Sequence, residues 1–102
     1  MSAEILGADA FEKDAMLIEL RHEYGEDVPY TTFYGWCQTL KIDSGLVFYG
    51  ADDVLTLLTL IWARFQKGYR PLDRTTIHKL RKGYADARTN RKTRATRFKG
   101  NG

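Results

Sequence analysis

The stretch YTTFYGWCQTLK, residues 30–41, decides how the chain is expected to fold. Its apolar side chains recur at i, i+3, i+4 and i+7, the spacing of one face of an α-helix; they are Phe33, Trp36, Cys37 and Leu40. The opposite face is polar and carries Thr31, Tyr34, Gln38 and Lys41. The pattern predicts an amphipathic helix that begins at Thr31 or Thr32, buries one face and exposes the other.

A helix is expected before this segment. From about Asp9 the apolar residues again recur at helical spacing, and Gly25 followed by Pro29 is typical of a helix end. Two helices joined by a short turn, the second of them amphipathic, are what a helix-turn-helix motif requires. In that motif the polar face of the second helix lies in the major groove of DNA.

A third helix is expected over residues 51–67. Asp52 and Asp53 favour a helix start through their charge, and Gly68 favours the stop. The stretch from Val54 to Phe65 is apolar around most of its circumference, so this helix is predicted at the centre of the core or at a subunit interface. The second reading leaves a homodimer open.

Two further elements complete the expected fold. The turn-forming residues 43–45 precede the β-prone run 46–49, which indicates a small β-hairpin or a single strand. A fourth helix is expected after Pro71 and Asp73, with Ile77, Leu80 and Tyr84 as its buried stripe. The sequence therefore predicts a mostly α, winged helix-turn-helix-like domain of about four helices over 1–88, with a small β-hairpin wing. Residues 89–102 are predicted to form a basic, disordered C-terminal tail.

Charge is divided unevenly along the chain. Residues 1–60 hold three basic and eleven acidic side chains, a net charge of −8, whereas residues 61–102 hold thirteen basic and two acidic ones, a net charge of +11. The total of +3 conceals this asymmetry. A basic half is typical of a polyanion partner, and duplex DNA is the partner that the expected helix-turn-helix favours.

Nothing in the sequence indicates an enzyme, a metal site or a cofactor. Cys37 lies on the apolar face of its expected helix. His22 and His78 lie far apart in the chain, and with Cys37 they lack metal-ligand spacing. We expect Cys37 to be a buried, inert thiol. The longest apolar run is about twelve residues, against roughly 20 for a membrane span, and no secretion signal is visible. We expect a soluble cytoplasmic protein, nucleoid-associated if bacterial.

The order of motifs adds a resemblance. The helix of 31–40 is followed by a β-prone run ending in Tyr49, by ADDVLTLL at 51–58, by KGY at 67–69 and by PLDRTTI at 71–77. This resembles the DNA-binding domain of MerR-type regulators and the related excisionase-like winged-helix proteins, over about half of the chain. The resemblance implies a helix-turn-helix, a wing ending in an aromatic residue, and an acidic helix start after it.

The resemblance implies that Thr31, Thr32, Tyr34 and Gln38 face the bases and that Tyr49 is the wing contact. Three departures are visible: no arginine in the recognition run, no basic residue in a shortened wing, and a basic tail where the family has its dimerisation helix. From the charge we expect further DNA contacts, which are Lys41, Arg70, Arg74, Lys79, Arg81, Lys82, Arg88, Arg91, Lys92, Arg94, Arg97 and Lys99.

Two alternatives stay open. The acidic first half and its aromatic residues suit a protein-interaction adaptor built on a winged-helix scaffold, with the protein partner on the acidic N-terminal half. The basic tail alone suits an RNA or ribosome binder that needs no base reading by the folded domain.

Overall fold

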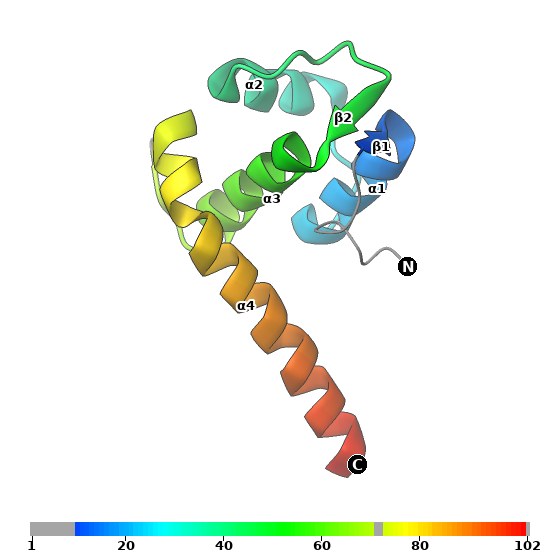
Figure 1. Cartoon of the computed structure of the whole chain (residues 1–102), viewed down its shortest axis with the longest axis vertical. Helices are drawn as coiled ribbons and strands as arrows, with labels where there is room; N and C mark the ends of the chain where they lie inside the picture. Colours follow the sequence, from blue (N-terminus) through cyan, green and yellow to red (C-terminus); the bar gives the residue numbers. More distant parts are fainter. Residues whose placement is uncertain (1–9, 71–72, 102) are drawn as a thin grey trace.

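The computed structural model describes the backbone of residues 10–70 and 73–101 and the side chains up to Asn90. The predicted mostly α class with four helices is confirmed, and a two-stranded antiparallel sheet accompanies the helices (Figure 1). The elements are β1 (Ala10–Glu12), α1 (Lys13–Tyr24), α2 (Tyr30–Leu40), β2 (Phe48–Gly50), α3 (Ala51–Phe65) and α4 (Arg74–Asn101).

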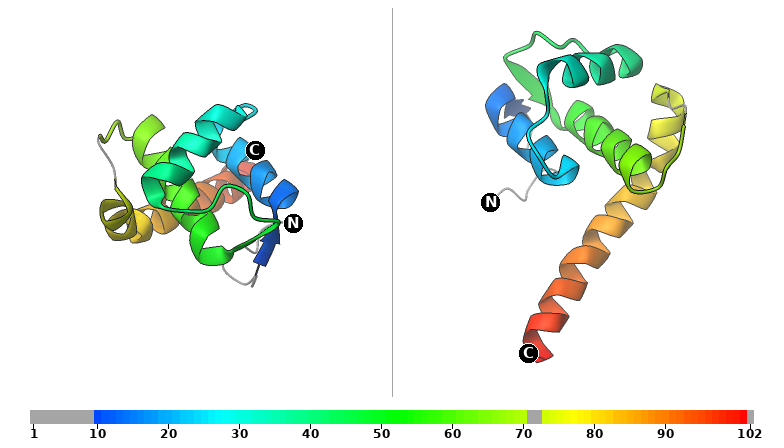
Figure 2. Two further views of the ribbon diagram at one scale, coloured as in Figure 1. Left: turned by 90° about the horizontal axis from the view of Figure 1, so that it is seen from above. Right: turned by 180° about the vertical axis from the view of Figure 1, so that it is seen from behind.

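Helix α3 lies at the centre of the molecule, with the other three helices around it (Figures 1 and 2). From Thr56 to Ala63 every side chain is buried, which agrees with a helix that is apolar around most of its circumference. Thr56 and Thr59 are buried polar residues, and each hydroxyl donates to the carbonyl oxygen four residues earlier, at 2.7 Å. Of the two readings that the sequence left open, the core of this chain is the one observed.

The predicted buried face of α2 is confirmed. Phe33, Trp36, Cys37 and Leu40 are each at most 3% exposed. The helix start is different from the prediction, because Pro29 is the N-cap and Thr31 and Thr32 already lie inside the first turn. No side-chain cap bond is formed, and the carbonyl of Pro29 accepts the first helical hydrogen bond, from the backbone N–H of Phe33 at 3.0 Å. A Cβ added at Gly35 would meet no atom within 4 Å, so no other backbone approaches α2 there.

Of the two alternatives that the sequence left open for 42–50, the wing hairpin is wrong and the single strand is observed, as β2. Strand β2 pairs instead with β1, which lies about 38 residues earlier in the chain. In this antiparallel pair Phe11 lies opposite Tyr49. Residues 41–47 therefore form a loop rather than a hairpin arm. The strand partner was missed because we expected the first helix to start near Asp9, which itself lies outside the described residues. Helix α1 begins only at Lys13.

The predicted stripe of α4 is confirmed for Ile77 and Tyr84, which are fully buried, while Leu80 is half-buried against the core. The backbone differs from the prediction at the far end, where α4 stays helical to Asn101 and the expected disordered tail is not observed. Within the described residues, no helix is both long and apolar enough to cross a membrane.

Candidate nucleic-acid interface

The polar face of α2 is open to solvent, as predicted. Thr31, Tyr34 and Gln38 are exposed, as is Lys41 just beyond the helix, whereas Thr32 is half-buried. The amide nitrogen of Gln38 donates to the hydroxyl of Tyr34 at 3.1 Å. Because these two side chains hold each other in place, the face presents an ordered pair of polar groups rather than two independent ones.

Tyr49 has a structural position that does not fit a DNA contact. Its side chain is 1% exposed, and its hydroxyl donates to the carbonyl of Asp43 at 2.7 Å and accepts from the backbone N–H of Leu46 at 3.2 Å. Burial raises the pKa of this hydroxyl above its ordinary value. Tyr49 therefore anchors the 41–47 loop to the core, and the wing contact that the family resemblance implied is not available on the surface.

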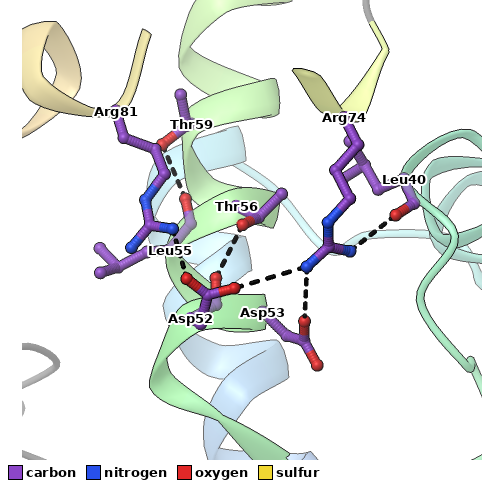
Figure 3. A network of polar contacts seen from close by, with 8 residues as sticks. All are labelled: Leu40, Asp52, Asp53, Leu55, Thr56, Thr59, Arg74 and Arg81. Atoms are coloured by element: carbon purple, nitrogen blue, oxygen red, sulfur yellow. Dashed lines mark hydrogen bonds and ion pairs between the residues drawn. The ribbon is translucent and has the colours of Figure 1, made fainter. Parts of the chain in front are cut away.

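Two arginines predicted to contact DNA are paired inside the chain (Figure 3). Arg74 donates to the carbonyl of Leu40 at 2.7 Å and lies 3.4 Å from both Asp52 and Asp53. Arg81 donates to Asp52, and this bond lowers the pKa of that carboxyl below its usual range. The two guanidinium groups join α4 to the start of α3, so we no longer expect them to be free for phosphates.

Three further cations lie at the surface, Arg70 before α4 and Lys79 and Lys82 on it. Arg70, Lys79 and Lys82 are exposed, and Lys82 pairs with Asp86 at 3.5 Å across one helical turn. Such exposed pairs contribute little to stability. These three side chains remain candidates for phosphate contacts.

Arg88 stands where α4 leaves the folded core. Its guanidinium donates to the hydroxyl of Tyr84 at 3.1 Å and lies 3.6 Å from Glu19 of α1. The same tyrosine hydroxyl donates to Glu23 of α1 at 2.9 Å, and burial raises its pKa. The root of the distal helix is therefore tied to α1 through one tyrosine and one arginine.

Beyond Arg88, α4 projects away from the rest of the molecule (Figure 1). We call residues 88–99 the basic arm; it carries Arg88, Arg91, Lys92, Arg94, Arg97 and Lys99. No acidic residue follows Asp86 in the chain. The side chains of arm residues 91–99 lie outside the described ones, so the helical backbone and the sequence define the arm.

The two predicted contact regions lie at opposite ends of the molecule. Helix α2 lies at one end of the molecule and the C-terminal end of α4 lies at the other. Helix α3 and the first turns of α4 lie between them (Figure 1 and the right view of Figure 2). A duplex that contacted both regions would have to run along the 44 Å length of the molecule. The sequence did not reveal this separation, because it depends on the direction in which α4 leaves the core.

Cys37 has the surroundings of an inert thiol. It is 1% exposed, and burial raises its pKa from 9.0 to about 11. Among the residues that the structure describes, no three His, Cys, Asp or Glu side chains gather closely enough to hold a metal ion.

We expect this thiol to react with a disulfide reagent at pH 8 only as fast as the chain opens. As pH rises above 9, the unfolded chain loses the thiol proton first, so the folded state should lose stability progressively toward pH 11. Urea unfolding at pH 8 and pH 10 checks this, with Cys37→Ala as the reference that lacks the effect. Equal losses in both proteins would contradict it.

Comparison of the chain with protein-family models, with curated proteins and with solved structures finds no match in any of the three.

Proposed function

We propose that this chain is a small DNA-binding protein of helix-turn-helix type that attaches to duplex DNA through the basic arm. The observation that carries the proposal is a helix with six cations and no carboxylate over 88–99, which projects from the folded core. The order α1, α2, β2, α3 and α4 is the one that the resemblance to MerR-type and excisionase-like domains implied, without its wing hairpin. A regulatory or architectural role on DNA fits this arrangement.

The dimensions of the arm favour duplex DNA over duplex RNA. Residues 88–99 extend about 18 Å at 1.5 Å per helical residue, and a helix is about 10–12 Å wide with its side chains. The major groove of B-form DNA, about 12 Å wide, admits such a helix. The deep, narrow major groove of A-form RNA does not. A helical arm can therefore lie in the major groove of B-form DNA, whereas it can only lie against the outside of an A-form RNA duplex.

The second part of the proposal is that α2 reads the bases. Its exposed face offers Gln38 for adenine and Thr31 for a phosphate or a thymine methyl group, as the sequence led us to expect. Lys41 is the only cation on this face. We therefore assign attachment to the arm. Sequence preference is assigned to α2, as a second contact with DNA.

Fluorescence anisotropy with a labelled 24-base-pair DNA duplex and the RNA duplex of the same sequence tests the proposal. We expect DNA to bind more tightly than RNA at about 100 mM salt, with a log–log salt slope of about −4 to −6 if most arm cations meet phosphates. Equal affinity for the DNA and RNA duplexes would mean that the arm contacts the phosphates from outside rather than lying in the major groove. Absence of binding to both would refute the proposal.

A further inference from the structure

Gln38 is an exposed side chain whose amide group is nevertheless held in place. The amide nitrogen donates to the hydroxyl of Tyr34 at 3.1 Å, one helical turn earlier on the same face of α2. The ring of Tyr34 stacks in turn on that of Tyr30, one further turn earlier, with centroids 6.2 Å apart. A glutamine alone on a helix surface samples many rotamers, so this run of three touching side chains removes freedom that exposed residues normally keep.

The other end of this run is anchored to the folded core by Lys13. The ammonium group of Lys13 lies 5.9 Å from the ring centroid of Tyr30 and 5.6 Å from that of Phe33, which is buried. The same ammonium group donates to the carbonyl of Ser44 at 2.8 Å, and Lys13 is half-buried at the start of α1. Contacts therefore run without a break from the core, through Lys13 and the two tyrosines, to the amide group of Gln38.

The amide group held in this way offers one donor and one acceptor to a ligand. One N–H of Gln38 is used on Tyr34, which leaves the second N–H and the carbonyl oxygen for pairing. In the major groove, adenine presents the complementary groups, which are the acceptor N7 and the donor N6 amino group. Guanine presents two acceptors, N7 and O6, so the amide oxygen would face O6 with no hydrogen atom between them. The arrangement therefore favours an A·T pair over a G·C pair.

Charge adds little to this face of α2. Residues 30–41 hold no carboxylate and one cation, Lys41, which is exposed. Asp43 follows in the loop, and its carboxylate accepts from the backbone N–H of Gly45 at 2.8 Å. Lys13, the cation beside Tyr30, is half-buried. Because the cations and the carboxylate nearly balance, we expect this face to act on preference among sequences rather than on overall affinity.

We propose that Tyr34 is a positioning residue, which holds the amide group of Gln38 so that α2 prefers an adenine in the major groove. This role rests on the proposed function, because α2 must reach duplex DNA for the amide group to meet a base. Tyr34 itself reads no base in this arrangement. It improves discrimination because the cost of immobilising the glutamine, a factor of roughly two to ten in affinity, is met before DNA binds.

Selection of bound duplexes from a random DNA pool by the full-length chain supplies the site for the test. The selected duplex and copies in which one A·T pair at a time is replaced by G·C are then compared by fluorescence anisotropy. For the unaltered chain, one of these replacements should weaken binding by about tenfold, the discrimination that one bidentate contact gives. Gln38→Ala should abolish this difference. Tyr34→Phe should reduce it by roughly twofold to tenfold, because phenylalanine keeps the ring but removes the hydroxyl that holds the amide group.

Tyr30→Phe is the matched control, because it removes from the same face a hydroxyl that makes no hydrogen bond within the described part of the chain. It should discriminate like the unaltered chain, and all three variants should keep the salt slope that the arm sets. Full discrimination by Tyr34→Phe or by Gln38→Ala would overturn the inference, as would equal binding of every duplex by the unaltered chain while the salt slope persists. Absence of binding to any duplex would instead refute the proposed function, and this role of Tyr34 with it.

Discussion

The variant in which Arg91, Lys92, Arg94, Arg97 and Lys99 are all glutamine is expected to lose most of the affinity of the chain for duplex DNA. Each neutralised phosphate contact contributes about −0.9 to the log–log salt slope, so five contacts account for about −4.5. We expect the slope to become shallower by up to about that amount, with an affinity loss of about two orders of magnitude at about 100 mM salt. Anisotropy titrations at several salt concentrations measure both quantities.

The design keeps the fold intact. Glutamine has nearly the helix propensity of arginine and lysine, so the arm should stay helical. Arg88 is left unchanged because it bonds Tyr84 and pairs with Glu19. Arg21→Gln is the control, since Arg21 is a cation outside the arm that pairs with Asp27 at 3.2 Å. If the arm variant kept the slope of the unaltered chain, the cations of Arg70, Lys79 and Lys82 would have to carry the attachment instead.

Local patterns predicted the helices well. The spacing of Phe33, Trp36, Cys37 and Leu40 specifies the buried face of α2 because side chains three and four residues apart share one side of a helix. The same reasoning placed α3 in the core. These features depend only on neighbours in the sequence, and hydrophobic periodicity reports them directly.

Pairing between distant segments could not be predicted in the same way. Strands β1 and β2 have three residues each, too few for an alternating pattern to be seen, and their partnership joins residues about 38 positions apart. The family resemblance led us to place Tyr49 on the surface, yet its hydroxyl closes a loop inside the fold.

The predicted DNA-contact residues fell into two groups, paired and unpaired, for a related reason. A count of charges treats every arginine alike, but Arg74 and Arg81 have carboxylate partners on α3, whereas the arm has no acidic residue of its own. Exposed and buried aromatic residues look the same in a sequence. Tyr30 and Phe48 became distinguishable from Phe33 and Trp36 through their exposure.

Trp62→Ala is expected to destabilise the folded domain by about 3–5 kcal/mol, the usual cost of removing a large aromatic side chain from a core. Trp62 is 6% exposed on α3, its ring centroid lies 5.8 Å from that of Tyr84 on α4, and a Cβ at Gly83 would lie 3.4 Å from its ring. Domains of this size are stable by about 5–15 kcal/mol in total, so little stability would remain. Urea denaturation followed by circular dichroism measures the change.

The same substitution tests whether α4 is held on the core in solution. Tyr84 receives both the Trp62 contact and the bond from Arg88, so the packing of this one tryptophan fixes the root from which the arm projects. Tyr69→Ala is the control, because Tyr69 is 44% exposed and its loss should cost less than about 1 kcal/mol. A cost below about 1 kcal/mol for Trp62→Ala as well would mean that α4 does not pack on α3, and the arm would then be attached only through the 66–73 connection.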